Sequence, residues 1–238
     1  MKKTTLILVA LCGSCMAQAQ FRIGVKAGLG AAYQSKYQLT DAEKAAPYFD
    51  NYLNGSKAAY YLGVSADWAL GKHISIQPSL LYSSKGSMTG TKTMARADDM
   101  IFQVDITGEN RLNYLELPLN ILYKQKLGKG KIFAGAGLYG ALYLNGHKEG
   151  DFLIRENPKI KDPLPKDGSS AYEGRLGPLY NGNQADAKVW DSGINFTAGY
   201  ALPQGLQIAL NYSSGFNETY YGKNRVYSLS VSYYLHKK

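Results

Sequence analysis

The stretch LNYLELPLNILYKQKLGKGK, residues Leu112 to Lys131, alternates apolar and polar side chains through most of its first half. Successive side chains of an extended backbone point to opposite faces, so this pattern predicts a β-strand with two different faces. The apolar face carries Leu115, Leu117, Leu119, Ile121 and Tyr123, and the polar face carries Tyr114, Glu116, Asn120 and Lys124. A soluble protein would bury the apolar face, whereas a membrane barrel would turn it toward lipid.

Seven other segments alternate with the same period of two residues, which predicts eight strands in all. They span about residues 21–33, 58–70, 72–84, 131–144, 190–200, 206–212 and 227–235. The segment 131–144 is the least clear, because Gly135, Ala136, Gly137 and Gly140 weaken the contrast between its faces. The final segment has an apolar face formed by Tyr227, Leu229, Val231 and Tyr233.

The connections between these segments alternate in length. Short turns at Gly71, residues 127–130 and residues 203–205 follow the second, fourth and sixth segments. The other connections are long and polar, and the longest runs from about Asn145 to Lys188. All long connections therefore emerge at one end, as in outer-membrane barrels with short periplasmic turns and long extracellular loops. The expected fold is all-β, an eight-stranded antiparallel up-and-down transmembrane β-barrel.

Alternation alone does not decide which face lies inside, and the first twenty residues supply a second argument. Lys2 and Lys3 precede a short apolar run and the sequence Ala17-Gln18-Ala19, a pattern typical of a secretory signal peptide cleaved after Ala19. A lipoprotein signal that uses Cys15 is the alternative. We expect a cleaved signal peptide over residues 1–19, a barrel domain over residues 20–238, and export to the outer membrane of a Gram-negative cell.

The two cysteines, Cys12 and Cys15, both lie in the segment expected to be removed. The barrel domain would then have no disulfide, no catalytic thiol and no cysteine-bound zinc. The formal charge of +9 falls to +7 without Lys2 and Lys3 (9 − 2 = 7). This excess suits contact with anionic lipid or lipopolysaccharide, but the basic residues are dispersed, so we expect no nucleic-acid partner.

Three stretches carry a family resemblance. YLELPLNILYK at 114–124, the glycine-rich IFAGAGLYGALYL at 132–144 and RIGVKAGLG at 22–30 resemble the PorT-type outer-membrane β-barrel proteins of Bacteroidetes. The resemblance covers nearly all of the expected barrel domain and implies a porin-like barrel, about as large as other small eight-stranded outer-membrane barrels. Most such relatives have no assigned role, whereas PorT itself is associated with protein secretion across the outer membrane. An accessory role in secretion is therefore one functional alternative.

Other motifs favour structural interpretations over catalytic ones. Residues 135–140 match G-x-G-x-x-G, but a dinucleotide site needs this motif between a strand and a helix, and here it lies within a predicted strand. His73, His147 and His236 have no spacing that indicates a catalytic triad or a metal site. The acidic residues of the long connections are mixed with lysine and arginine and do not match an EF-hand. We expect no catalytic residue, no cofactor, no metal and no enzymatic activity.

Polar residues of the inward face form the most informative set. Because an eight-stranded barrel is narrow and unpaired buried charge is costly, we expect ion pairs among them and hydrogen bonds from their amides to the charged groups. The expected lumen cluster is Arg22, Lys26, Asp67, Gln77, Glu116, Asn120, Lys124, Asp191, Asn195 and Asn211. It would form a polar plug; the alternative is a narrow channel for small solutes or a site for a small ligand.

The remaining expectations concern partners. The nine outward residues expected to face lipid are Leu115, Leu117, Leu119, Ile121, Tyr123, Tyr227, Leu229, Val231 and Tyr233. The longest loop offers Tyr172, Leu176, Pro178 and Tyr180 as a candidate surface contact. We expect a monomeric barrel in contact with outer-membrane lipid and lipopolysaccharide, whose surface loops recognise or scaffold a protein partner, either at the surface or in secretion machinery.

Overall fold

The computed structural model describes residues 21–35, 49–97, 100–157, 171–181, 190–219 and 222–235. The predicted signal peptide, residues 1–19, lies outside the described residues. Within the described part, no helix is long and apolar enough to span a membrane.

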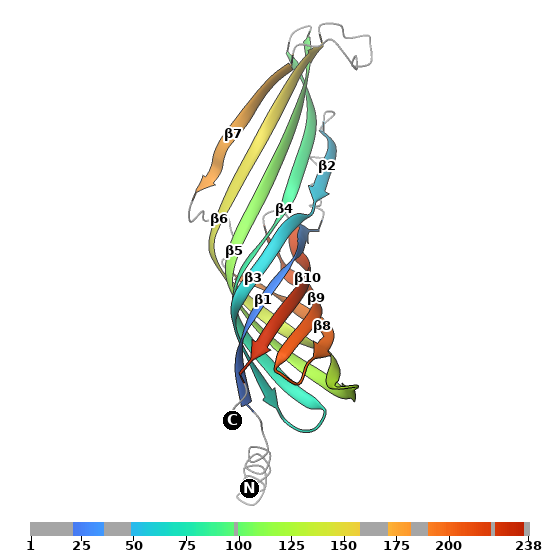
Figure 1. Ribbon diagram of the computed structural model, residues 1–238. Coiled ribbons are helices and arrows are strands. Elements are labelled where there is room, and N and C mark those ends of the chain that lie inside the picture. The colour runs from blue at the N-terminus through green and yellow to red at the C-terminus, as the bar shows by residue number, and fades with distance from the viewer. Residues whose placement is uncertain are drawn as a thin grey trace, which may run out of the picture.

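The described chain folds into antiparallel strands (Figure 1). They are β1 (Phe21–Gln34), β2 (Phe49–Gly55), β3 (Lys57–Ala69), β4 (Ile74–Ala97), β5 (Met100–Leu127), β6 (Gly130–Asn157), β7 (Ala171–Asn181), β8 (Trp190–Ala201), β9 (Leu206–Thr219) and β10 (Gly222–Tyr234). Among these residues, eight strands close a ring in the order β1, β3, β4, β5, β6, β8, β9, β10 and back to β1. The prediction of an eight-stranded antiparallel barrel is confirmed.

The first and last strands close the ring. Gly24 of β1 pairs with Tyr234 of β10, and this register continues to Gln34 opposite Asn224. The other side of β1 pairs with β3 from Phe21 to Ala32, so β1 has no free edge over residues 24–32. The start of β1 and the end of β10 lie at the same end of the ring as the three short turns (Figure 1). Two of these turns contain a glycine with positive φ, Gly128 and Gly205, a conformation that other residues rarely adopt.

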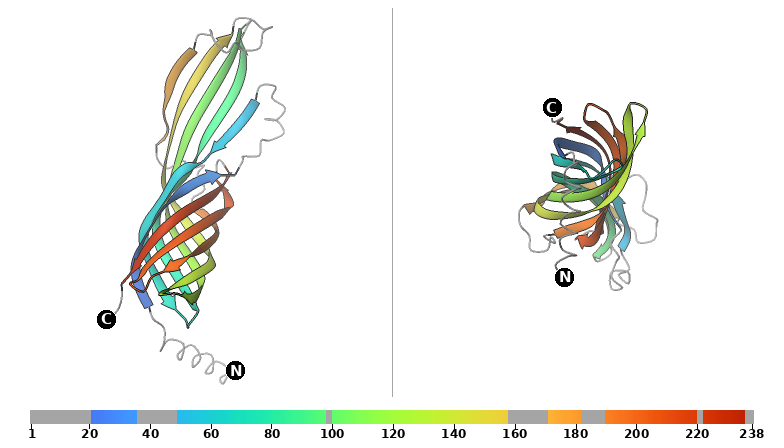
Figure 2. Two further views of the ribbon diagram at one scale, coloured as in Figure 1. Left: turned by 45° about the vertical axis from the view of Figure 1, so that its right-hand side comes forward. Right: turned by 90° about the horizontal axis from the view of Figure 1, so that it is seen from below.

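Three strands continue well beyond the ring at the opposite end. β4 and β5 stay paired up to Ala97 and Met100, and β5 and β6 up to Ile101 and Asn157. β2 pairs with the extension of β4, and β7 pairs with the extension of β6. These segments form an open five-stranded sheet, here called the outer sheet: β2, residues 88–97 of β4, 100–109 of β5, 147–157 of β6, and β7 (Figures 1 and 2).

The outer sheet corrects the expectation of long loops. The segment from Asn145 to Lys188 is not one loop, because residues 145–157 and 171–181 are strand. The sequence contains part of the signal, since Phe102, Val104 and Ile106 of β5 recur at a period of two. Charged and polar residues interrupt the pattern elsewhere in this region, and an open sheet away from the barrel does not require one uniformly apolar face.

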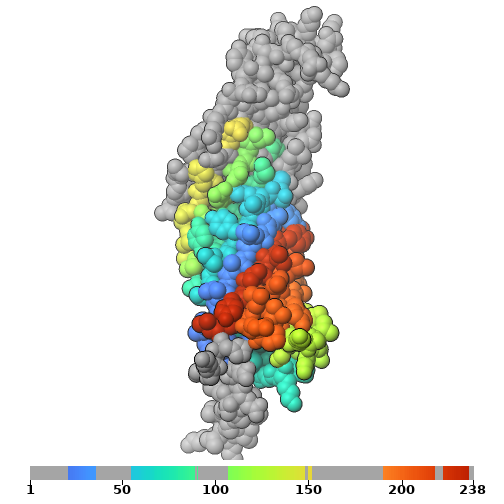
Figure 3. Space-filling model, in the orientation of Figure 1, coloured from blue at the N-terminus to red at the C-terminus, as the bar shows by residue number. Residues whose placement is uncertain are grey.

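The ring has an apolar outer face and a polar interior. All nine residues expected to face lipid are exposed on the outside, with 37% to 59% of their surface accessible. On the face shown in Figure 3, side chains of β1, β3, β9 and β10 form a continuous outer surface. Buried residues of the ring are mostly polar or charged, including Lys26, Asp67 and Asp191. This arrangement is the reverse of a soluble protein, whose buried residues are mostly apolar.

Candidate functional site in the barrel interior

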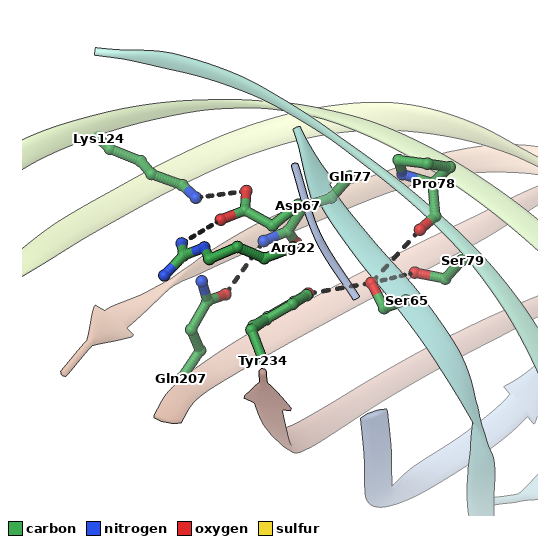
Figure 4. A network of polar contacts seen from close by, with 9 residues as sticks. All are labelled: Arg22, Ser65, Asp67, Gln77, Pro78, Ser79, Lys124, Gln207 and Tyr234. Atoms are coloured by element: carbon green, nitrogen blue, oxygen red, sulfur yellow. Dashed lines mark hydrogen bonds and ion pairs between the residues drawn. The ribbon is translucent and has the colours of Figure 1, made fainter. Parts of the chain in front are cut away.

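The polar side chains of the interior form the candidate site, and those nearest the short turns are centred on one carboxylate (Figure 4). Lys124 of β5 donates a hydrogen bond from Nζ to Oδ1 of Asp67 in β3, over 2.6 Å. The other carboxylate oxygen of Asp67 pairs with the guanidinium of Arg22 from β1. The side chains of Asp67 and Lys124 are 1% and 8% exposed, whereas that of Arg22 is 25% exposed. One buried anion therefore holds two cations from different strands.

Neutral hydrogen bonds cross the ring beside this ion cluster. Gln77 of β4 donates to Gln207 of β9 over 3.0 Å. The hydroxyls of Tyr234 and Ser65 are 3.0 Å apart, and Ser79 donates to Ser65 over 2.8 Å (Figure 4). These contacts join β3, β4, β9 and β10 across the interior. Hydrogen-bonded buried polar groups of this kind stabilise the ring, in which most of the described buried residues are polar or charged.

The middle of the ring contains a second charged group. Glu116 of β5 lies 2.5 Å from Nζ of Lys85 and accepts a hydrogen bond from Ser83 over 3.0 Å. The Nζ atom of Lys85 is also 4.4 Å from the centroid of the Tyr139 ring. Lys26 is buried nearby, 6.0 Å from the Tyr61 ring centroid. A lysine over the face of an aromatic ring is attracted by the ring's negative face.

Asp191 organises the part of the interior toward the outer sheet. Its carboxylate accepts hydrogen bonds from Tyr139 over 3.2 Å and from Asn224 over 3.0 Å. Gln34 donates to Asn224 over 3.1 Å and accepts from Ser87 over 2.7 Å. This chain of contacts connects β8 to β6, β10, β1 and β4.

The structure places the predicted lumen residues inside the ring. Eight of the ten are at most 9% exposed, namely Lys26, Asp67, Gln77, Glu116, Asn120, Lys124, Asp191 and Asn195, while Arg22 and Asn211 are partly exposed. Asp67 pairs with Arg22 and Lys124, as expected, whereas Glu116 pairs with Lys85, which lies outside the predicted set. Two of the predicted amides bond to neutral groups instead: Gln77 bonds to Gln207, and Asn211 bonds to Thr197, Tyr61 and Ser230. For these two amides the prediction is wrong, because barrel closure, rather than residue type, decides which side chains meet.

Several important interior residues were not predicted. Lys85 lies one residue past the expected end of its strand, although the inward parity of Gln77, Ser79 and Ser83 continues to it. Tyr139 lies in the segment whose glycines weaken the pattern, and Tyr114, Asn224 and Tyr234 were not included in the cluster. Gly193 of β8 lies opposite Tyr139, and a Cβ there would lie 2.5 Å from Cε1 of the tyrosine ring. Inward glycines provide space for inward aromatic rings.

Side chains fill most of the ring's width. The cavity in the middle, lined by Lys26, Glu116 and Asn120 among others, has a volume of about 50 Å³. This volume holds only a few waters. The interior is therefore a polar core with hydrogen-bonded side chains across it. A larger cavity of about 250 Å³ opens at the short-turn end.

Other candidate residues lie apart from this interior. The segment 135–140 lies within β6 and not at a strand-to-helix turn. His73 lies in the β3–β4 turn, with Nδ1 3.0 Å from the carbonyl oxygen of Lys124 and its ring stacked on Tyr123. The candidate surface contact is part of strand β7: Tyr172 pairs with Ile154, Leu176 with Gly150, and Tyr180 with Lys148.

The sequence matches a family of outer-membrane proteins. The family model described as outer membrane protein beta-barrel domain matches residues 16–221, and the chain belongs to this family. No curated protein sequence matches the chain.

Among the solved structures to which the chain is similar are three outer-membrane proteins. The attachment invasion locus protein Ail of Yersinia pestis, in complex with the heparin analogue sucrose octasulfate, is 8% identical, with 91% of this chain and 99% of that chain covered and a TM-score of 0.35. Neisserial surface protein A is 12% identical, with 90% and 97% covered and a TM-score of 0.34. The COG4313 outer membrane channel of Pseudomonas putida F1 is 10% identical, with 90% and 95% covered and a TM-score of 0.29.

Proposed function

We propose that this member of the outer membrane protein β-barrel domain family is a non-enzymatic, integral barrel whose outer sheet recognises or scaffolds a protein partner at the cell surface. The observation that supports the proposal is the continuation of β4, β5 and β6 beyond the ring, with β2 and β7 added at the two sides. A closed barrel needs no such extension to span a bilayer, because a transmembrane strand needs only about 9–11 residues. β5 spans 28 residues.

The two faces of the ring support membrane insertion. Exposed leucine and tyrosine side chains cover the outside, where lipid would contact them, and buried charges pair inside. Export would use the signal peptide at residues 1–19, with the short turns in the periplasm and the outer sheet outside the cell. The ring closes on itself without a second copy, so the protein would insert as a monomer, with lipopolysaccharide and phospholipid around it.

The outer sheet offers strand edges for recognition. In the described part of the chain, β2 pairs only with β4 and β7 pairs only with β6, so each has an edge to which no described strand is paired. Exposed edges can bind an extended segment of another protein through backbone hydrogen bonds. Pro178 lies where the β6–β7 register is irregular, between Leu176 and Tyr180. Proline is accepted on edge strands and at bulges, because it lacks a backbone N–H donor.

Site-specific photo-crosslinking in whole cells tests this role. A photoreactive amino acid at position 176 in β7 or position 52 in β2 is expected to capture a protein, whereas the same group at Lys129 in a short turn is the matched control. Capture of the same species at all three positions, or at none, would contradict recognition by the outer sheet. Protease access to the β4–β5 tip in intact cells would separately verify the orientation of the barrel.

The resemblance to PorT-type proteins of Bacteroidetes, carried by residues 114–124 and 132–144, supports accessory action in protein secretion as a second candidate function. Deletion of the gene would then remove specific proteins from the secreted fraction, and a tagged chain would co-purify with a stable complex. Unchanged secretion together with recovery of the barrel alone would exclude this candidate. No observation favours solute conduction, because side chains cross the interior and the middle cavity is about 50 Å³.

A further inference from the structure

The cavity at the short-turn end is lined by many charged and polar side chains. It has a volume of about 250 Å³ and collects residues from β1, from all three short turns of the ring and from the adjoining strand ends. Lys72 and His73 come from the β3–β4 turn, Lys129 from the β5–β6 turn, and Leu202 and Pro203 from the β8–β9 turn. Its volume exceeds by several times the roughly 30 Å³ that a water molecule occupies in the liquid. A small polyatomic ion fits within it.

The lining is strongly basic. Six cationic side chains surround the cavity, namely Arg22, Lys72, Lys124, Lys126, Lys129 and Lys131. Within the described part of the lining, Asp67 is the only carboxylate. Asp67 is buried inside the ring, where it pairs with Arg22 and Lys124 (Figure 4). The lysines of the turns are exposed around the opening, so the positive charge is concentrated on the solvent side of the cavity.

Ser75 provides a second, independent observation. This residue of β4 lines the cavity and is fully buried. Among the described residues, its hydroxyl oxygen has no hydrogen-bond partner. A buried hydroxyl without a partner is costly, and an anion in the cavity would accept its hydrogen bond.

We infer that this cavity binds a phosphate-type anion. The hydroxyl of Ser75 and the ammonium groups of the turn lysines donate hydrogen bonds to its oxygens. The positive charge of the lysines at the opening attracts anions to the cavity. Two sources offer the same chemistry: inorganic phosphate in solution, and the phosphodiester of an anionic phospholipid in the adjacent membrane leaflet. The site is at the opposite end of the ring from the outer sheet, so it does not depend on surface recognition.

The test uses the full mature chain folded in zwitterionic detergent and in nanodiscs. Inorganic phosphate is titrated by calorimetry at constant ionic strength, and retained lipid is measured by native mass spectrometry from nanodiscs with and without phosphatidylglycerol. The cavity variant is Lys126→Gln with Lys129→Gln. Its matched control is Arg111→Gln with Lys223→Gln, which removes two positive charges at the other end of the ring. Ser75→Ala probes the buried hydroxyl, and heat-dependent gel mobility verifies that every variant is folded.

The cavity variant and Ser75→Ala are each expected to weaken binding about three- to tenfold, with the control within about twofold of wild type. Saturable binding of inorganic phosphate with this ranking identifies a free anion as ligand. Selective retention of phosphatidylglycerol with the same ranking, without saturable phosphate binding, identifies a lipid headgroup. Three results would overturn the inference. They are the absence of both phosphate binding and phosphatidylglycerol retention, equal weakening of binding in the cavity and control variants, and unchanged binding by Ser75→Ala. The result of photo-crosslinking at the outer sheet does not depend on whether the cavity binds an anion, so the two proposals can fail separately.

Discussion

The Nζ atom of Lys124 lies 2.6 Å from Oδ1 of Asp67, although their strands, β5 and β3, are not neighbours in the ring. The ion pair therefore reaches past β4 inside the barrel, and Arg22 joins it from β1. Each cation depends on the same buried carboxylate.

Replacement of this carboxylate should destabilise the barrel. Asp67→Asn leaves the buried Lys124 without its counter-charge, and we expect the free energy of unfolding to fall by about 3 kcal/mol. Urea titration in lipid vesicles, followed by tryptophan fluorescence, measures the change. The double variant Asp67→Asn with Lys124→Met removes the isolated charge and should recover much of the loss. An equal loss in the single and double variants would show that charge pairing is not the cause.

A substitution at Gly28 should disturb the aromatic packing of the interior. Gly28 is opposite Tyr61 in the β1–β3 register, and a Cβ at Gly28 would lie 2.2 Å from Cζ of the tyrosine. We expect Gly28→Val to displace the ring from Asn211 and to cost about 1–3 kcal/mol of unfolding free energy. Gly140→Val is the control, because nothing lies within 4 Å of a Cβ there. If adding Tyr61→Ser recovers part of the unfolding free energy, the clash with the tyrosine side chain is the source of the loss. An equal loss for Gly28→Val and Gly140→Val would contradict this account.

If the ring spans a membrane, a charged residue on its outer face should destabilise the barrel more at the middle of the bilayer than near its surface. Leu119 lies near the middle of the ring part of β5, and Leu119→Arg should destabilise the folded barrel in vesicles by about 2–4 kcal/mol. Leu127→Arg is the matched control beside the short turn, where the expected cost is about 0–1 kcal/mol. Both leucines are exposed, at 52% and 55%. Equal costs at the two positions would argue against a bilayer around the ring.

The filled interior predicts an electrically silent protein. Wild-type barrels in planar bilayers should show no discrete current steps, because Gln77, Gln207 and Tyr234 make contacts across the ring. The triple alanine variant of these residues should produce steps if it remains folded by gel mobility. Reproducible steps from the wild type, absent from mock preparations, would instead support solute conduction.

The N-terminal residues predict a processed chain. Intact mass of the protein from outer membranes should correspond to a chain that begins at Gln20, because the sequence Ala17-Gln18-Ala19 resembles a signal peptidase site. A mass that begins at Cys15 with added acyl groups would identify the lipoprotein alternative. Ala19→Arg should delay cleavage, and an unchanged cleavage site in this variant would contradict the assignment.

The strands of the ring were predictable because alternation is a local property. Asp67, Glu116 and Lys124 were expected inside from parity alone, since residues two apart share a face of a strand. The same rule extended by one residue would have included Lys85. The outer sheet was harder to predict, because charged and polar residues interrupt the alternation in much of its sequence and β7 follows a connection that alternation does not describe.

The sequence by itself determined the strands of the ring, their two faces and the end at which the short turns gather, because these features follow from the period of two residues and from the spacing of turn residues. Only the tertiary structure decided which residues meet. Ring closure brings Asp67 to Lys124, Asn224 to Asp191 and three separate turns around one basic cavity. These contacts depend on register and on distances across the ring, which no local pattern of residues contains.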